Sequence, residues 1–415
     1  MRILQINTVY GTGSTGRIMA GLYNMSADNG YEPYAAFARS EVPEGIKGYH
    51  IGSRSDSLCH VAKDILFDGS GFGSKWETQK FLKWVDEIKP DIIHLHNIHG
   101  FYLQIEELFD YIKKNNIPVI WTFHDCWPMT GHCAHFDYIG CDRWKTGCYR
   151  CPQHLQSYPY SISDNSRYNY DRKRKAFTGV QNRTIVTPSK WLADIVKQSY
   201  LKEYPVRVIP NGIDTDVFRI ISGEASDQKS ICTDAWHHHM ILGVANVWTR
   251  RKGTEYFEQL ADMTNDSFII CLVGVSERQK KTLQRRHKGK IIGIQHTESQ
   301  EELAELYNRA LCFVNPTLEE NFPTTNLEAL ACGTPVITFR TGGSPESIDE
   351  TCGYVTDKGN TQQVYEKIAE IVKHGKEWYT KKCRKRALEY SRDKRFNEYM
   401  KLYSEASDIR YHKSV

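Results

Sequence analysis

Two glutamates, Glu320 and Glu328, lie on a segment whose other residues predict a turn that leads into a short helix. Pro323 is typical of a first helical turn and Gly333 of a helix end, so we expect the helix to begin near Thr324. A helix N-terminus carries unpaired N–H groups and a partial positive charge, which stabilise a bound phosphate. Either glutamate alone could equally be an ordinary surface carboxylate in contact with solvent. Together with the start of the helix, the two glutamates predict a binding site for a diphosphate.

A second group of polar residues follows two expected strands. Residues 119–123 are followed by His124 and Asp125, and residues 91–96 end among further histidines. Side chains at the carboxyl ends of parallel strands face the ligand, so we prefer a functional role here over a structural one. Several histidines together also suggest a metal, but we favour hydrogen bonding to a bound ligand or support of the cleft structure. The candidates are His96, Asn97, His99, His124 and Asp125.

Four cysteines, Cys133, Cys141, Cys148 and Cys151, fall within 19 residues. Four thiolates in a reducing compartment indicate a structural zinc site more readily than two disulfides, which remain the alternative. Cys126, His132 and His135 are substitute ligands. Four protein ligands leave no open coordination position, so we expect no part for this metal in bond cleavage.

A glycine-rich turn, residues 11–16, follows the first expected strand and matches G-x-G-x-x-G. A dinucleotide site calls for an acidic residue after the second strand, and Arg39 stands there instead. An NADP site remains open as an alternative. We favour a turn in which Gly13 and Gly16 let backbone amides approach an anionic ligand.

Short apolar runs alternate with amphipathic stretches along most of the chain, which predicts βαβ units and parallel sheets. The pattern occurs twice, so the fold class is α/β with two doubly wound, Rossmann-like domains facing a cleft. The helices expected near residues 78–89 and 103–114 each place four apolar residues on one face. The remaining expected strands are 2–8, 34–38, 184–187, 240–247, 268–275, 290–294, 311–315 and 335–339.

Composition excludes several classes. The 415 residues carry 54 basic and 50 acidic side chains, a formal charge of +4, which argues against a nucleic-acid partner. No apolar run approaches the roughly 18 residues of a membrane span. We expect a cytoplasmic protein, with the inner membrane face as a further candidate location. The basic stretch 381–395 is interpreted as a solvated helix face, with peripheral membrane association as the alternative. We interpret 220–236 and the His237–His239 tract as polar linker.

The spacing of Glu320 and Glu328 resembles the glutamate, seven residues, glutamate signature of retaining glycosyltransferases of family four, which have the GT-B fold. Three further segments, 187–191, 209–214 and 247–253, are similar to family segments, so the resemblance spans essentially the whole chain. It implies an acceptor-binding domain at 1–203 with a Cys-rich loop at 126–153. It also implies a nucleotide-sugar domain at 204–389. A C-terminal helix at 390–415 would follow and pack back on the first domain.

The resemblance also implies roles for single residues. Glu320 would contact the transferred sugar and Glu328 the ribose hydroxyls, while Arg251 and Lys252 stabilise the leaving diphosphate and His124 orients the acceptor. Attack by an acceptor hydroxyl on the same face would retain configuration, without a protein nucleophile or catalytic metal. The implied donor-binding residues are Gly13, Gly16, Asn211, Arg250, Asn321, Phe322, Thr324, Thr325 and Glu328.

The sequence departs from the family pattern at two places. Asn321-Phe322-Pro323 replaces Gly-Phe-Gly, so Pro323 lacks one backbone donor, and Asn246 stands where an arginine is usual. These departures resemble a subgroup that builds bacterial exopolysaccharide, capsule or O-antigen. The implied reaction moves a hexose from a UDP or GDP sugar to a glycan, with a lipid-linked glycan as one candidate. A nucleotide-sugar epimerase, a zinc-stabilised binding module and an NADP oxidoreductase are the alternatives.

Overall fold

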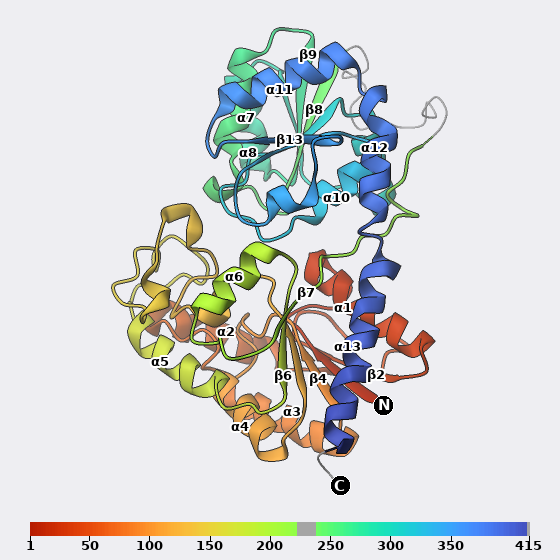
Figure 1. Ribbon diagram of the computed structural model, residues 1–415. Helices are drawn as coiled ribbons and strands as arrows, with labels where there is room; N and C mark the ends of the chain where they lie inside the picture. The colour runs from red at the N-terminus through yellow and green to blue at the C-terminus, as the bar shows by residue number, and fades with distance from the viewer. Residues whose placement is uncertain (222–237, 413–415) are drawn as a thin grey trace. The chain divides into compact units, whose positions relative to one another are not determined.

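The computed structural model describes residues 1–221 and 238–412, with backbone only for 408–412. The chain divides into two compact units (Figure 1). Unit 1 comprises Met1–Pro210 and the chain from Arg395 onward, and unit 2 comprises Asn211–Lys394. Most of the expected linker 220–236 and His237 of the histidine tract lie outside the described residues.

Unit 1 contains a seven-stranded parallel sheet in the order β3-β2-β1-β4-β5-β6-β7. This order is that of a doubly wound sheet, because the chain starts in the middle and builds outward to both edges. Its strands are β1 (Arg2–Ile6), β2 (Glu32–Phe37), β3 (Gly48–His50), β4 (Ile92–Leu95), β5 (Val119–Thr122), β6 (Arg183–Thr187) and β7 (Val206–Val208).

Helices connect these strands, and each predicted amphipathic stretch of unit 1 forms one. The 78–89 stretch is α3 (Lys75–Ile88), which buries Phe81, Leu82 and Val85, and the 103–114 stretch is α4 (Ile105–Asn115). The others are α1 (Gly13–Asp28), α2 (Arg54–Phe67), α5 (Ser166–Phe177) and α6 (Lys190–Gln198).

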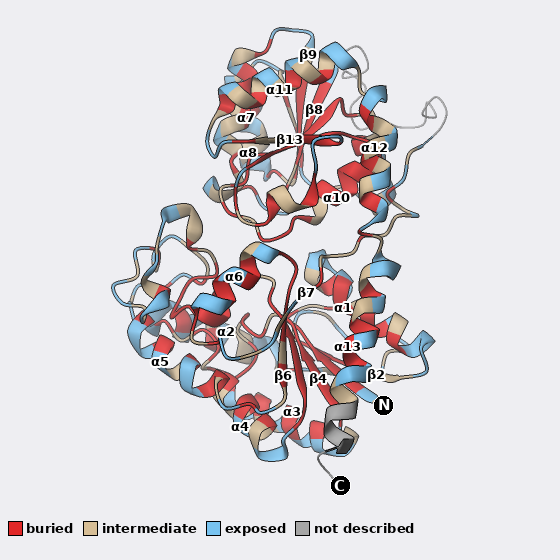
Figure 2. Ribbon diagram, viewed as in Figure 1, coloured by how far each residue is buried: buried red, intermediate tan, exposed pale blue. Residues whose placement is uncertain are grey.

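Unit 2 contains a six-stranded parallel sheet in the order β10-β9-β8-β11-β12-β13. Its strands are β8 (His239–Val244), β9 (Phe268–Val273), β10 (Ile291–Ile294), β11 (Cys312–Asn315), β12 (Val336–Phe339) and β13 (Gly353–Thr356). Its helices are α7 (Thr254–Met263), α8 (Glu277–Arg286), α9 (Gln300–Arg309), α10 (Thr324–Ala331), α11 (Thr361–His374) and α12 (Glu377–Leu388). The inner strands of both sheets are almost wholly buried (Figure 2), which is why they read as apolar runs in the sequence.

Three edge strands, β3, β7 and β13, were missed by the sequence interpretation. Each is short, and β3 and β7 contain no fully buried residue, so neither produces an apolar run. Because β7 pairs with β6 in the first sheet, unit 1 extends to Pro210 rather than to residue 203. Unit 2 likewise runs to Lys394 rather than to residue 389.

The last helix, α13 (Arg392–His412), packs on unit 1, as predicted for a returning C-terminal helix. Phe396, Tyr399 and Tyr403 are buried against Ile3 of β1 and Ile92 of β4. The fit is close at one position, since a Cβ added to Gly21 of α1 would lie 2.4 Å from the ring of Phe396. The end of the chain therefore completes the core that its first strand begins.

Candidate active site

In unit 2, the turn after β8 lies against the loop after β11. The backbone N–H of Leu318 donates to the carbonyl of Arg251 at 2.8 Å, and the Arg251 guanidinium donates to the carbonyl of Glu319 at 2.6 Å. A Cβ on Gly253 would lie 2.3 Å from the carbonyl oxygen of Pro316, at a φ of 79°. Glycine is therefore required for the close approach of the two segments.

This approach pairs the two charged residues expected to act at the reacting centre. The Lys252 ammonium donates to the Glu320 carboxylate, and both side chains are half-buried. Burial lowers the pKa of Lys252, and the neighbouring Glu320 partly offsets this effect. A cation and a carboxylate are thus held together at the edge of the second sheet, where a ligand of such a fold binds.

The helix that follows this loop begins where the sequence predicts. Pro323 is the N-cap of α10, and Thr324 and Thr325 form its first turn. Upstream, the Asn211 side chain donates to the carbonyl of Phe322 at 2.8 Å. The segment 209–214, which is similar to a family segment, therefore supports the loop. Asn321 and Phe322, in the same loop, are buried.

Glu328 lies within α10 and is almost fully buried. The Tyr307 hydroxyl of α9 donates to its Oε2 at 3.3 Å. A second pair, Asn315 and Asn326, joins β11 to α10 through a 2.8 Å side-chain hydrogen bond. Sequence reasoning missed Tyr307, Asn315 and Asn326, because their spacing along the chain forms no pattern.

In unit 1, His124 belongs to a buried hydrogen-bonded chain that starts at β1. Gln5 Oε1 lies 3.2 Å from His96 Nε2, and His96 Nδ1 lies 3.1 Å from His124 Nε2. Burial lowers the pKa of His124 to about 4 and the pKa of His96 well below its ordinary value, so both rings are neutral near pH 7. The chain links Gln5, His96 and His124, and the tautomers of the two rings decide which nitrogen of each contact donates.

His94 lies on the same face as His96, because side chains two residues apart on a strand point the same way, and the ring centroids are 4.1 Å apart. Its Nδ1 lies 2.7 Å from the Tyr403 hydroxyl of α13, and its Nε2 lies 2.8 Å from Thr122 Oγ1. Burial lowers the pKa of His94 to about 3. His94 is therefore a core residue that connects the strand to the C-terminal helix.

His99 and Asp125 form a separate pair, since His99 Nε2 donates to Asp125 Oδ2 at 2.8 Å. Burial raises the pKa of Asp125. The Coulomb attraction and the hydrogen bond of His99 act in the opposite direction, and the net effect lowers this pKa to about 2. The carbonyl of Asn97 accepts from the hydroxyls of Thr8 and Tyr102 at 3.1 and 2.8 Å. The structure thus gathers all five predicted acceptor-side residues, and it supplies Gln5 and Thr8 in addition.

The glycine-rich turn leads into α1. Gly13 is its first residue with a φ of 62°, and the N–H of Gly11 donates to the carbonyl of Gly16 at 2.9 Å. A Cβ on Gly16 would lie 3.1 to 3.3 Å from Val9, Tyr10 and Gly11. Gly16 therefore allows the turn to close on itself, and the exposed Gly13 lies at the helix start.

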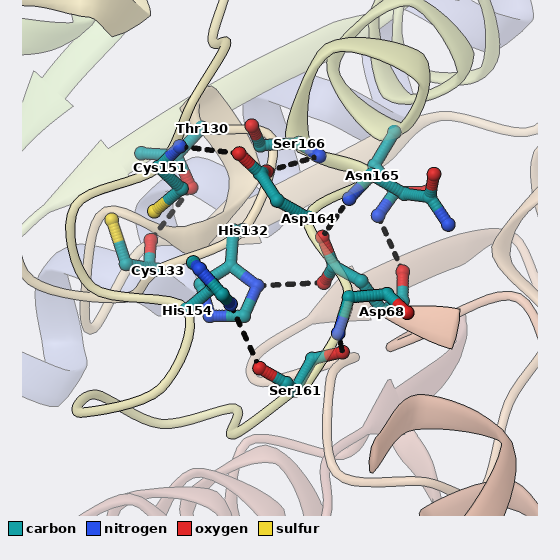
Figure 3. A network of polar contacts seen from close by, with 12 residues as sticks. Asp68, Thr130, His132, Cys133, Cys151, His154, Ser161, Asp164, Asn165 and Ser166 are labelled. Carbon is teal, nitrogen blue, oxygen red and sulfur yellow. Dashed lines mark hydrogen bonds and ion pairs between the residues drawn. The ribbon is translucent and has the colours of Figure 1, made fainter. Parts of the chain in front are cut away.

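The four clustered cysteines line one cavity of about 20 Å³ together with His132, roughly the room that one water molecule needs. Figure 3 shows the surrounding network, in which His132 Nδ1 lies 2.6 Å from Asp68 Oδ1. Within the described part of the chain, no group of three or more Cys, His, Asp or Glu residues is arranged to hold a metal ion, and every cysteine there is a free thiol. The structure thus supports neither the zinc prediction nor its disulfide alternative.

Two family models match the sequence. Residues 43–217 match Glycosyltransferase Family 4, and residues 240–393 match Glycosyl transferases group 1. The division between the two models falls between β7 and β8, where the first sheet ends and the second begins. In the described residues, no helix is both long and apolar enough to cross a membrane.

Three known proteins illustrate the similarity. The protein named colanic acid biosynthesis glycosyl transferase WcaC of Escherichia coli is 23% identical over 88% of this chain and 89% of its own. An N,N'-diacetylbacillosaminyl-diphospho-undecaprenol alpha-1,3-N-acetylgalactosaminyltransferase of Campylobacter jejuni is 27% identical over 51% of this chain and 57% of its own. The crystal structure of Anabaena HepE with UDP-glucose has a TM-score of 0.68 at 13% identity, covering 98% of this chain and 100% of HepE.

Proposed function

Because the chain belongs to the group 1 and family 4 glycosyltransferases of the GT-B fold, we propose that it transfers a hexose from a nucleotide-diphosphate sugar to a glycan hydroxyl, with retention of configuration. The product would be a bacterial surface polysaccharide. Similarity to WcaC along nearly the whole chain supports this pathway class. The observation that carries the proposal is the Lys252–Glu320 pair beside the start of α10.

Unit 2 binds the donor in this proposal. Glu328 accepts hydrogen bonds from the ribose hydroxyls, and the first turn of α10 faces the diphosphate with Thr324 and Thr325. The HepE complex with UDP-glucose supports a uridine nucleotide, and GDP is the second candidate. Arg250 is exposed at the same turn as Lys252 and is available to a phosphate.

The bond between the sugar C1 and the leaving phosphate oxygen breaks as negative charge grows on the diphosphate. Lys252 and Arg251 stabilise that charge because they are preorganised cations in a partly buried site. The acceptor hydroxyl attacks C1 from the side of the leaving group, and its proton passes to the departing phosphate oxygen. Glu320 holds the sugar hydroxyls and positions Lys252.

Unit 1 binds the acceptor. His124, at the end of the hydrogen-bonded chain from Gln5, orients the attacking hydroxyl. His96, Asn97, His99 and Asp125 shape the surrounding wall. The name of the Campylobacter relative supports a lipid-linked glycan as acceptor, which would be met at the cytoplasmic face of the membrane.

The cysteine loop contributes to the acceptor wall. A structural zinc on Cys133, Cys141, Cys148 and Cys151 remains a proposal that rests on the spacing of these cysteines in the sequence. Catalysis does not depend on this metal, because the charge stabilisation described above comes from unit 2 side chains.

Calorimetric titration with UDP and GDP tests the donor site. Glu328→Ala should weaken nucleotide binding by about 1.5–3 kcal/mol, the value of hydrogen bonds to a charged group. Tyr307→Phe is the matched control, since it removes the partner of Glu328 and leaves the carboxylate in place. Equal affinity of Glu328→Ala and the unaltered protein would remove Glu328 from the site. Sugar-nucleotide conversion without any acceptor would favour an epimerase instead.

A further inference from the structure

Helix α2 has an inverted pattern of burial. Its two fully buried residues are polar, His60 and Asp64, whereas Leu58, Leu66 and Phe67 are exposed. Phe67 keeps 60% of its surface exposed and Leu66 keeps 46%. A surface helix of a water-soluble protein normally buries its apolar side, and an exposed apolar patch commonly marks an interaction site.

The polar side of α2 is held in place by specific contacts. His60 Nδ1 lies 2.9 Å from the Ser74 hydroxyl, and the N–H of Gly73 donates to His60 Nε2 at 3.1 Å. Burial lowers the pKa of His60 to about 4 and raises that of Asp64 to about 7, which favours their neutral forms. Rotating the helix to hide its leucines would break these contacts, so the apolar side stays outward.

A loop from the second half of unit 1 widens the apolar area. The carbonyls of the last turn of α2 accept hydrogen bonds from Ile162 N at 2.8 Å and Asn165 Nδ2 at 2.7 Å. Figure 3 shows how Asp68, at the end of α2, holds the N–H of Asn165 at 3.0 Å. The loop in turn exposes further apolar side chains. We define the α2 surface as Leu58, Ile65, Leu66, Phe67, Leu155, Tyr160 and Ile162.

The charges of α2 itself favour an anionic partner. Arg54 and Lys63 are exposed, whereas Asp64 and Asp68 are buried and Asp56 is half-buried. Arg167, at the start of α5, is also exposed, and the exposed Asp164 in the preceding loop accepts hydrogen bonds from the N–H groups of Cys151 and Ser166. Leucine, phenylalanine and tyrosine beside lysine and arginine are the residues with which a surface helix binds a membrane interface.

We propose that the α2 surface docks on the surface of an anionic lipid bilayer, with its apolar side chains in the acyl boundary and Lys63 and Arg54 at the headgroups. This location differs from the basic stretch 381–395 considered from sequence alone. The biological role of this docking rests on the proposed function, because a lipid-linked acceptor would be presented at that bilayer. Its test requires no catalysis.

Co-sedimentation of the full chain with vesicles tests the proposal. We expect binding to phosphatidylcholine vesicles that contain phosphatidylglycerol, weaker binding to phosphatidylcholine alone, and loss of binding as salt rises. Leu66→Ser with Phe67→Ser should lower the partition coefficient by about tenfold or more, since each side chain contributes apolar burial in the bilayer. Lys63→Glu should lower it by about fivefold or more.

Leu388→Ser is the matched control, because Leu388 on α12 of unit 2 is as exposed as Leu66, at 46%. Circular dichroism and UDP affinity of all variants verify that they fold. If the Leu66/Phe67 variant sediments with vesicles as well as Leu388→Ser does, the proposal is wrong. A lipid-free dimer that the same variant abolishes, seen by sedimentation velocity, would also overturn it. Vesicle binding by a chain without transferase activity would support this inference and contradict only the proposed function.

Discussion

At the scale of single residues, the candidate site combines charges that would be weak on an open surface. Lys252 and Glu320 come from segments 68 residues apart and meet in a partly buried position. Removal from water strengthens the field of a cation on a nearby phosphate, because fewer water dipoles screen it. The same burial lowers the pKa of Lys252, and the neighbouring Glu320 partly offsets this effect.

Lys252→Ala should therefore lower kcat more than it raises the donor KM, since the charge matters most as the diphosphate leaves. Steady-state kinetics with the donor varied at saturating acceptor measures both constants. Arg250→Ala is the comparison, because Arg250 is exposed on the same turn and should affect KM mainly. A rise in KM alone for Lys252→Ala would assign Lys252 to ground-state binding.

At the scale of elements, the ends of β4 and β5 hold three neutral histidines in contact. Burial lowers the pKa of His94 to about 3 and of His124 to about 4, and lowers that of His96 well below 6.5. At pH values between these lowered pKa values and 6.5, the ordinary pKa of histidine, the unfolded chain binds more protons than the folded one. The free energy of unfolding therefore rises with pH across this window and falls on acidification.

We expect the free energy of unfolding, from urea titrations at pH 7 and pH 5, to be smaller at pH 5. One buried histidine contributes up to about 1.4 kcal/mol for each pH unit below 6.5. His94→Gln should reduce the difference between the two pH values, because it removes one titrating group. An equal or greater stability at pH 5 would contradict the neutral cluster.

The cysteine loop makes a separate prediction at this scale. If the four thiolates hold zinc, metal analysis of the purified chain should find about one zinc per molecule. Cys148→Ser should then lose the metal and lower the melting temperature of unit 1, because metal binding contributes to folding. Cys59→Ser, at an exposed cysteine of α2, should keep it. Metal-free protein with unaltered activity and free thiols would end the zinc hypothesis.

At the scale of the whole molecule, the chain returns to its start. Residues after Arg395 pack on the strands formed by the first half, so the core of unit 1 is incomplete without α13. The Tyr403 hydroxyl lies 2.7 Å from His94, and Tyr399 lies 3.1 Å from Thr122. These bonds connect α13 to the strands that carry the candidate acceptor-side residues.

Tyr403→Phe should lower the stability of unit 1 by about 1–3 kcal/mol, because it leaves a buried imidazole nitrogen without its partner. Nucleotide binding by unit 2 should be unchanged, since no contact there is removed. Differential scanning calorimetry with and without UDP measures the two effects. Tyr31→Phe, a half-buried tyrosine packed against the same cluster, is the control. A coincident loss of UDP affinity would show that the two units do not respond independently.

The local sequence determined which elements form and where each candidate residue lies along them. Buried parallel strands are mostly apolar, so ten of the thirteen strands in the described residues stand out as runs, and Pro323 and Gly333 bound α10 as predicted. The short edge strands β3, β7 and β13 escaped because edge residues are partly exposed and carry no apolar run.

Only the tertiary structure decided which residues meet. Gln5 contacts His96 across 91 positions, Tyr307 reaches Glu328 from another helix, and Tyr403 reaches His94 across 309 positions. The inverted burial of α2 is of the same kind, since the contacts of His60 with Ser74 and Gly73 decide which side of the helix faces inward. Local periodicity and capping depend on neighbours within a few residues, whereas hydrogen-bond partners and exposure depend on how distant segments pack.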